Sequence, residues 1–520
     1  MPISGPPLEG PVVLHEILKT GLESKPDDDA LVSRRQRWSW RRLDDVSTRL
    51  AASYLELGLV PGDRVASLMP NRTELLVHYI ACMKSGLVAM PLNYRYMAPE
   101  IDHALSVGEP RILLAHDERR DDLAASKLAG KLPLGQISYD DDGGHSDVGA
   151  PSFKSLAEVS PVRDIAPPKS DDPAIIFFTS GSTGEPKGVT HTAQSLGWMF
   201  AIAASAFELS TDDVLLPGSS CSHIGGFIFA FAALGAAARL VIARHYDGDE
   251  ILALLRRERP TVLCMIPAAL FAVVRDPGAV AEDFASLRLV RAGADKVPAE
   301  LEAEFTALTG HVIDEGYGMS EVGLAALNPP SGRIVAGSVG RALAAVEFSL
   351  RDDAGNELPA DATGNLWIRT PSMMQGYWSS GVATAEVIRE GWLDSGDRMA
   401  ADGDGYLWFR GRKKQIIVHD GSNIFPQEVE EAVEAHPAVA LSGVIGIHDL
   451  VHGESVRAYV ALKPGVPRPT TGELIAAARA LIGYKAPEQI EFLDEIPLNP
   501  TGKVDRVALK KMAEARHEPA

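Results

Sequence analysis

Apolar runs alternate with amphipathic stretches through the central part of the chain. AIIFF at 174–178 is apolar throughout, whereas DEILALLRRER at 249–259 has apolar residues at helical spacing. Apolar strands without alternation, separated by helices, are typical of parallel sheets covered on both faces. The pattern predicts strands at 174–178, 239–243, 261–266 and 287–293, and helices at 193–207, 249–259 and 299–310.

The same alternation of strand and helix patterns recurs nearer the N-terminus, between residues 55 and 115, where RVASLMP, ELLVHYIACMKSG and RILLAH follow one another. No sequence repeat of about 20–50 residues is visible, which argues against a solenoid. A chain of 520 residues is too long for one ordinary core. We therefore predict a large α/β region built from related lobes, with an acidic, Gly/Pro/Ser-rich surface connection at 140–173.

The pattern changes after the basic stretch RGRKKQ at 410–415. The order becomes helix, strand, strand, helix, strand, which is an α+β unit of ordinary domain size. The predicted elements are a helix at 426–437, strands at 440–447 and 455–462, a helix at 471–483 and a strand at 489–493. We predict two domains, an N-terminal α/β domain at 1–411 and a small C-terminal α+β domain at 412–520.

Composition excludes several function classes. The net charge of −20 argues against a non-specific nucleic-acid binder and against binding to an anionic membrane surface. The longest apolar run, 224–238, is shorter than the roughly 18 residues that span a bilayer, so we expect a buried helix and no membrane span. No secretory signal is visible, and three scattered cysteines fit a reducing cytoplasm.

The loop TSGSTGEPKG at 179–188 follows an apolar strand and can hold phosphate. It is not a Walker A loop, because Pro186 stands where that motif needs glycine and Gly188 where it needs Ser or Thr. Its hydroxyls, exposed amides and single lysine suit an extended triphosphate. The candidate phosphate-binding residues are Thr179, Ser180, Gly181, Ser182, Thr183, Gly184 and Lys187.

Four further stretches contain residues suited to nucleotide chemistry. GYGMSE at 316–321 follows HVIDE, which reads as the end of a strand. Tyr317 can stack on adenine, Ser320 can bond the α-phosphate and Glu321 can hold Mg²⁺, which prefers oxygen ligands. Asp397 in GWLDSGDRM can contact ribose hydroxyls, and Arg412 in GRKK can supply a second ribose or phosphate contact. PLNPTGKVDR places Lys503 in a Pro/Gly turn.

Taken together, in this order and spacing, these motifs resemble the adenylate-forming superfamily. The resemblance runs from roughly residue 30 to residue 510 and is closest to its acyl- and aryl-CoA synthetase branch, the fatty-acid and 4-coumarate CoA ligases. It implies that ATP converts a carboxylic acid to an acyl-adenylate with release of pyrophosphate, and that a thiol, coenzyme A in most relatives, then forms the thioester. The implied cofactors and partners are ATP, Mg²⁺, coenzyme A and a small carboxylic acid.

By match to the superfamily, Lys503 bridges the substrate carboxylate and ATP, and Glu321 holds Mg²⁺. Ser320 and Thr179 join these two as catalytic residues. The resemblance also implies that the C-terminal domain rotates between the two steps about a hinge at Lys414. The remaining implied residues are Gly293, Ala294, Asp295 and Gly318 for AMP, His223, Gly225 and Gly226 for the acyl group, and Gly421 for the thiol tunnel.

Alternatives stay open at this point. One is a stand-alone adenylating enzyme that loads a carrier-protein thiol, and another is a non-catalytic AMP or acyl-adenylate binding protein. A luciferase-like oxygenase is a remote third, since nothing marks its light chemistry. Gly225 and Gly226 are equally compatible with space for a bulky acyl group, fatty or aromatic, and with helix packing. No arginine is recognisably aimed at a second carboxylate, which disfavours dicarboxylic acids, and a homodimer is left open.

Overall fold

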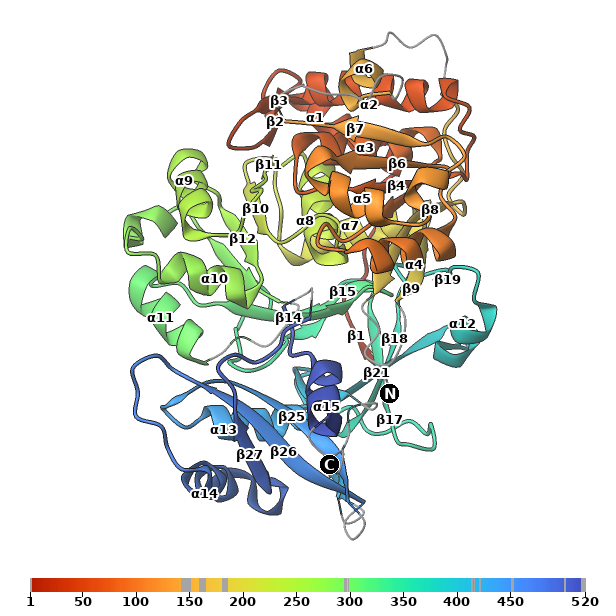
Figure 1. The fold of residues 1–520 in the computed structure, drawn as a ribbon. Coiled ribbons are helices and arrows are strands. Elements are labelled where there is room, and N and C mark those ends of the chain that lie inside the picture. The colour runs from red at the N-terminus through yellow and green to blue at the C-terminus, as the bar shows by residue number, and fades with distance from the viewer. Residues whose placement is uncertain are drawn as a thin grey trace. The chain divides into compact units, whose positions relative to one another are not determined.

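The computed structural model describes residues 2–141, 151–158, 165–179, 186–293, 297, 299–412, 415, 417–419, 422–449, 453–499 and 502–515. The chain divides into two units (Figure 1). The larger comprises Pro2–Phe348 and Ile368–Leu393, and the smaller comprises Ser349–Trp367 and Asp394–Ala520. The mixed α/β architecture confirms the predicted fold class.

The first lobe of the larger unit contains a seven-stranded sheet. Its strands, in spatial order, are β19 (Gly376–Tyr377), β9 (Lys187–Thr192), β8 (Pro173–Thr179), β5 (Val88–Pro91), β4 (Arg64–Leu68), β6 (Ile112–His116) and β7 (Gln136–Tyr139). The five strands from β8 to β7 are parallel, and β9 and β19 add antiparallel pairs at one edge. Helix α4 (Ala98–Gly108) buries Ile101 and Leu105 in the core on this sheet.

The second lobe contains a nine-stranded sheet, also with a parallel centre. Its strands, in spatial order, are β16 (Arg341–Ala342), β15 (Gly323–Leu327), β14 (Asp314–Met319), β13 (Leu289–Ala292), β12 (Val262–Met265), β10 (Val214–Gly218), β11 (Arg239–Val241), β2 (Asp29–Val32) and β3 (Arg37–Ser39). Helices α9 (Gly248–Glu258), α10 (Pro267–Val274) and α11 (Ala299–Thr309) share one apolar core with it.

The central elements confirm the predictions from hydrophobic periodicity. The strands predicted at 174–178, 239–243, 261–266 and 287–293 correspond to β8, β11, β12 and β13, and the predicted helices correspond to α7 (Ala193–Ala206), α9 and α11. Helix α8 (Ile224–Gly235) occupies most of the apolar run and buries Phe227 and Phe231 completely. The segment predicted as a connection at 140–173 includes a short helix, α6 (Phe153–Glu158), because Phe153 and Leu156 are buried.

A further group of short strands was not foreseen. β1 (Ile3–Ser4) pairs with β17 (Glu347–Arg351) at Ile3↔Phe348, and β20 (Ile388–Arg389) pairs with β21 (Trp392–Ala401) at Ile388↔Leu393. β22 (Leu407–Arg412) pairs with β21 at Asp397↔Arg412. The division between the units falls within β17, β18 (Thr363–Arg369) and β21. β1 and β20 have two residues each, and strands this short leave little periodic signal.

The smaller unit also contains a five-stranded sheet with its own core. Its strands are β24 (Ser422–Ile424), β23 (Ile417–His419), β26 (Gly453–Leu462) and β25 (Val439–Asp449), with β27 (Gln489–Phe492) parallel to β26. Helices α13 (Pro426–Glu434), α14 (Thr471–Ile482) and α15 (Arg506–Ala515) complete it. All five elements predicted after residue 415 are confirmed, whereas the extent of the moving domain, 412–520, stays a prediction.

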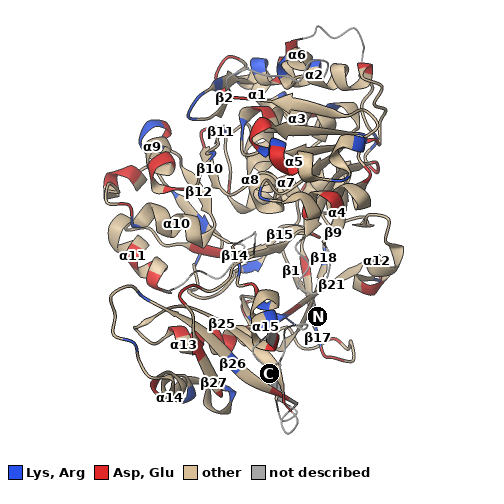
Figure 2. Ribbon diagram, viewed as in Figure 1, with Lys and Arg blue, Asp and Glu red and all other residues tan. Residues whose placement is uncertain are grey.

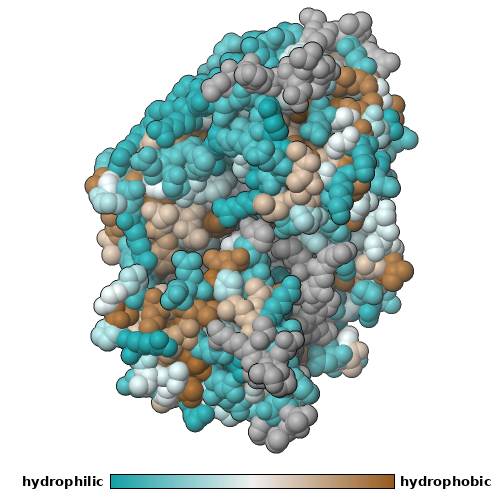
Figure 3. Space-filling model, in the orientation of Figure 1, coloured by the Kyte–Doolittle hydropathy of each residue, from teal (hydrophilic) through white to brown (hydrophobic). Residues whose placement is uncertain are grey.

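Charged residues of both signs are interspersed along the helices of both units (Figure 2). On the visible face, hydrophilic residues predominate over the lobe that carries α2 (Trp40–Glu56) and α5 (Arg120–Ala125) (Figure 3). In the described part of the chain, no helix is long and apolar enough to cross a bilayer.

Candidate active site

The glycine-rich loop joins two strands of the first lobe. Thr179 ends β8, Lys187 begins β9, and the two residues lie opposite each other in the antiparallel pair. The residues between them that were predicted to bind phosphate, Ser180, Gly181, Ser182, Thr183 and Gly184, lie outside the described residues. The structure therefore fixes the two ends of the loop and its lysine.

Tyr317 and Gly318 lie in β14 rather than in a loop, which corrects the expectation that the strand ends within HVIDE. β14 and β15 form an antiparallel hairpin, and Ser320 and Glu321 occupy its turn. A Cβ atom on Gly318 would lie 2.4 Å from the carbonyl oxygen of Gly323, so this position requires glycine. The hairpin holds Tyr317 almost fully buried, at 7 % exposure.

The Glu321 carboxylate is buried, at 8 % exposure, and is held by partners distant in sequence. The Tyr377 hydroxyl donates a hydrogen bond to Glu321 Oε1 at 3.0 Å. The Met374 N–H donates to the Glu321 carbonyl at 2.7 Å. Burial, and then the charge of Glu321, raise the pKa of Tyr377, so this phenol remains a donor. A fixed carboxylate is an oxygen ligand of the kind that Mg²⁺ prefers, so Glu321 fits the predicted metal role.

Tyr377 also contacts the lysine of the glycine-rich loop. The Lys187 ammonium lies 4.8 Å from the centroid of the Tyr377 ring, within the range of a cation–π interaction. The structure therefore brings Lys187 and Glu321, predicted separately, to opposite parts of one tyrosine. Sequence reasoning missed Tyr377, because GYW at 376–378 looks like an ordinary apolar strand end.

His191 is a second residue that the sequence did not reveal. It is fully buried in β9, and burial lowers its pKa to about 4, so the ring is neutral. Its Nε2 lies 2.8 Å from the Ser320 carbonyl oxygen. Because a carbonyl only accepts, Nε2 carries the proton and donates. The imidazole thus anchors the backbone of the turn that carries Glu321.

Two buried residues of opposite charge lie on β13 and on β14, the strand that carries Tyr317. Arg291 in β13 and Asp314 in β14 are opposite each other, and both are at most 3 % exposed. Burial raises the pKa of Asp314 to about 6, although Arg291 and a hydrogen bond from Asn328 Nδ2 oppose the shift. A Cβ on Gly316 would lie 1.6 Å from Arg291 Nη2, so the guanidinium packs directly against this strand.

The two glycines of the candidate acyl site differ. A Cβ on Gly226 would lie 2.4 Å from the Ser220 carbonyl oxygen, so Gly226 is required for packing. A Cβ on Gly225 would meet no described atom within 4 Å, so Gly225 borders open space. His223 precedes them at the N-cap of α8, and burial, followed by the charge of Arg95, lowers its pKa to about 4. A neutral imidazole beside open space suits the lining of an acyl site.

Asp397 and Arg412 form a cross-strand pair in the smaller unit. Arg412 Nε donates to Asp397 Oδ1 at 3.0 Å. The Asp397 side chain is buried, whereas that of Arg412 is 41 % exposed. The Arg412 side chain is thus partly exposed, and the buried carboxylate keeps it oriented.

Lys503 lies in a turn between β27 and α15. Its N–H donates to Asn499 Oδ1 at 3.0 Å, and its carbonyl accepts from the Asn499 N–H at 2.7 Å. Gly502 has a φ of +86°, which favours glycine. An isolated bridge between Leu498 and Val504 closes the turn. The backbone thus presents Lys503 from a short closed loop.

The other predicted residues are placed only in part. Gly293 follows β13, and its N–H donates to the Met265 carbonyl at 3.3 Å. Its neighbours Ala294 and Asp295, the hinge residue Lys414 and the tunnel residue Gly421 lie outside the described residues, so their roles stay predictions.

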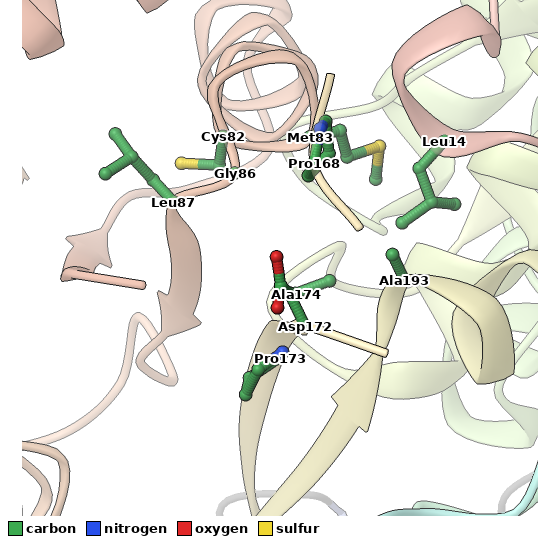
Figure 4. Close-up of a pocket in the computed structure, with 10 residues that line it drawn as sticks. All are labelled: Leu14, Cys82, Met83, Gly86, Leu87, Pro168, Asp172, Pro173, Ala174 and Ala193. Carbon is green, nitrogen blue, oxygen red and sulfur yellow. The ribbon is translucent and has the colours of Figure 1, made fainter. Parts of the chain in front are cut away.

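Two other features are separate from this site. The hollow in Figure 4 is lined by Cys82, Asp172, Pro173 and Ala193 among others, at the opposite end of β8 from Thr179. His116, Glu118 and Asp141 lie close enough together to resemble a metal site. Arginines already pair with both carboxylates, since Asp141 contacts Arg72 and Arg244, and Arg244 also contacts Glu118. This cluster is therefore an ion-pair network within the larger unit.

Comparisons with known proteins give a consistent result. The AMP-binding enzyme family matches residues 18–378, and the AMP-binding enzyme C-terminal domain matches residues 428–503. A fatty acid–[acyl-carrier-protein] ligase, ScoC, from Streptomyces coeruleorubidus is 31 % identical, covering 94 % of each chain. A feruloyl-CoA synthase from Amycolatopsis sp is 32 % identical over 88 % of this chain and 90 % of its own. The crystal structure of ATP-bound MatB from Rhodopseudomonas palustris has a TM-score of 0.89 at 29 % identity, covering 98 % of this chain and all of its own.

Proposed function

The chain belongs to the AMP-binding enzyme family, and from that premise we propose that it is an ATP-dependent acyl-CoA ligase. It activates a monocarboxylic acid, fatty or aromatic, as acyl-AMP with release of pyrophosphate, and then forms the acyl-CoA thioester. The observation that carries the proposal is the buried Glu321 carboxylate, joined through Tyr377 to Lys187. The similarity to a feruloyl-CoA synthase supports coenzyme A as the thiol.

The first step brings a substrate carboxylate against the α-phosphate of ATP. Both groups are negative, so the step depends on positioning and on positive charge. Mg²⁺, when bound with ATP, supplies charge neutralisation. Glu321 would hold the metal, Lys187 would contact the terminal phosphates, and Lys503 would bridge the acid and the α-phosphate. Pyrophosphate then leaves, and the acyl group carries AMP as a good leaving group.

The second step requires different groups around the same carbonyl. The thiol of coenzyme A attacks the acyl-AMP, and AMP leaves. In this proposal the C-terminal domain, 412–520, rotates about Lys414 between the steps, which removes Lys503 and brings Gly421 to the thiol channel. The local hydrogen bonds between Lys503 and Asn499 support this idea, because a turn held by its own residues can move with the domain and keep its shape.

Pyrophosphate release tests the proposal. It is measured against a panel of fatty, cyclic and aromatic acids, with and without coenzyme A, for the wild type and Lys503→Ala. Acid-dependent release that the substitution abolishes, with thioester formed only when coenzyme A is added, supports the ligase and identifies its acid. No release with any acid, alongside ATP binding, favours a non-catalytic AMP-binding protein.

A second candidate is an enzyme that loads a carrier-protein thiol. The similarity to a fatty acid–[acyl-carrier-protein] ligase favours it. The discriminating measurement offers the acyl-AMP formed by the enzyme to coenzyme A and to a phosphopantetheinylated carrier protein in parallel. Thioester on the carrier alone would replace the first proposal with this one.

The proposal extends to the setting of the enzyme. It includes a role in fatty-acid metabolism if the acid is fatty, and a cytoplasmic location. The three cysteines, Cys82, Cys221 and Cys264, are free and buried, which supports a reducing compartment.

A further inference from the structure

Tyr377 is held in place by the strand that begins with the loop lysine. β19 pairs with β9 at Tyr377↔Val189, two residues after Lys187. The Gln375 N–H donates to the Thr190 carbonyl at 2.8 Å, and the Trp378 N–H donates to the Gly188 carbonyl at 2.7 Å. The backbone on both sides of Tyr377 is therefore tied to β9, which fixes where its side chain starts.

From this position the side chain serves two charged groups at once. Its hydroxyl donates to Glu321 Oε1 at 3.0 Å, and its ring lies 4.8 Å from the Lys187 ammonium. Glu321 and Lys187 come from different lobes of the larger unit, the turn after β14 and the start of β9. Tyr377 thus joins the carboxylate and the cation. Glu321 contacts the phenol hydroxyl, and Lys187 contacts the π-system of the ring.

We propose that Tyr377 is a positioning residue for adenylate formation: its hydroxyl orients the Glu321 carboxylate toward the metal of Mg–ATP, and its ring keeps Lys187 at the entry of the phosphate loop. This inference rests on the proposed function, since it assigns Glu321 to Mg²⁺. Outer partners of metal-binding carboxylates fix the orientation of the ligand, and their loss costs about 10- to 100-fold in metal affinity or activity.

A purely structural role for Tyr377 makes a different prediction. A tyrosine that only fills space would be replaced by phenylalanine with little effect, because the ring and its packing are retained. Tyr377→Phe removes the hydroxyl and keeps the cation–π contact, whereas Tyr377→Leu removes both. The two substitutions separate the contribution to Glu321 from the contribution to Lys187.

The chain offers a matched control. Tyr94 also donates from its hydroxyl to a carboxylate, Glu118, and Arg119 lies 5.3 Å from the centroid of its ring. Tyr94 belongs to the ion-pair network of the larger unit and lies outside the predicted nucleotide motifs. Tyr94→Phe therefore removes the same kind of hydrogen bond at a place that the proposal does not involve.

The experiment measures ATP binding by calorimetry, with Mg²⁺ and with EDTA, for the full-length protein and its variants. The ratio of the two dissociation constants gives the gain in affinity that Mg²⁺ provides. We expect Tyr377→Phe to reduce this gain about 10- to 100-fold, and Tyr94→Phe to leave it unchanged. Tyr377→Leu should in addition weaken metal-free ATP about 2- to 5-fold, because Lys187 loses the aromatic face.

Two further readouts distinguish positioning from folding. Thioester formation from synthetic acyl-AMP needs neither Mg²⁺ nor the terminal phosphates, so Tyr377→Phe should retain it, with an unchanged melting temperature. An unchanged gain from Mg²⁺ in Tyr377→Phe, or an equal loss in Tyr94→Phe, would overturn the inference. The binding measurement uses no acid, so it tests Tyr377 even if no acid in the panel is activated and the proposed function fails.

Discussion

The turn that carries Glu321 and the turn that carries Lys503 are held in opposite ways. The Glu321 turn is anchored by His191, which lies 129 residues before Ser320 in sequence, and by Tyr377, 56 residues after Glu321. The backbone of the Lys503 turn is closed by Asn499, four residues away. The first turn keeps its geometry only within a folded larger unit, whereas the second carries its geometry with it. A group proposed to stay at the nucleotide and a group proposed to move would need this difference.

The largest expected effect comes from removing the Lys503 side chain. Lys503→Ala should lower acid-dependent pyrophosphate release about 10²- to 10³-fold, because one electrostatic partner of the transition state is lost. Thioester formation from synthetic acyl-AMP should be unchanged, since Lys503 is proposed to leave before that step. Lys510→Ala, on the exposed side of α15, is the control. An equal loss in both half-reactions would contradict a role confined to adenylation.

The second prediction concerns the long-range anchor and its pH dependence. His191 has an ordinary pKa of 6.5, lowered to about 4 by burial. Between these pH values the unfolded chain binds a proton that the folded chain does not, so the free energy of unfolding falls as pH drops from about 6.5 to 4. His191→Gln retains an N–H donor for the Ser320 carbonyl and removes the titration. The free energy of unfolding is measured with urea from pH 7.5 to pH 4.5. Its decrease over this range should be smaller in His191→Gln than in the wild type, by up to about 3 kcal/mol in total. An identical decrease in the free energy of unfolding in His191→Gln would refute the assignment of this pH dependence to His191.

Two glycines compare β14, the strand that leads into the Glu321 turn, with the Lys503 turn. Gly316→Ala places a methyl group against the buried Arg291 guanidinium, so we expect a loss of about 1–3 kcal/mol through overpacking. Gly502→Ala meets no described atom within 4 Å, and its cost of about 1–2 kcal/mol comes from the positive φ alone. The distinguishing measurement is Mg–ATP affinity, which Gly316→Ala should weaken and Gly502→Ala should leave intact. The reverse pattern would mean that the two turns are not held as described.

The smallest effect should come from the Asn499 side chain that closes the Lys503 turn. Asn499→Ala removes the acceptor of the Lys503 N–H, a hydrogen bond worth about 1 kcal/mol. Pyrophosphate release should fall about fivefold, with an unchanged Michaelis constant for ATP and an unchanged melting temperature. Asn499→Asp, which retains the acceptor oxygen, should recover most of the rate. A loss of stability with no change in rate would show that Asn499 supports the fold and not the position of Lys503.

Local patterns were sufficient for much of the fold. β8, α7 and α9 follow directly from apolar runs and helical spacing, and α13 to β27 appear in the predicted order. Local periodicity indicates which face of an element is buried, so the element can be predicted without knowing which other elements it packs against. It fails for β1 and β20, which have only two residues each, and the partner of β1 lies far along the chain, at Ile3↔Phe348. It also misplaced Tyr317, because GYGM contains two glycines and still continues a strand.

The sequence by itself determined which chemical groups this protein possesses, since a lysine in a Pro/Gly turn or a carboxylate after GYGM is a property of residue type and spacing. Only the tertiary structure decided which groups meet. The Tyr377 hydroxyl on Glu321, the His191 imidazole on Ser320 and the Arg291 guanidinium against Gly316 join segments from different strands. Such contacts leave no local signal, because their geometry arises from the packing of whole lobes. Burial then changes the chemistry of these groups, lowering the pKa of His191 and raising that of Tyr377, through a loss of solvent that no short stretch of sequence encodes.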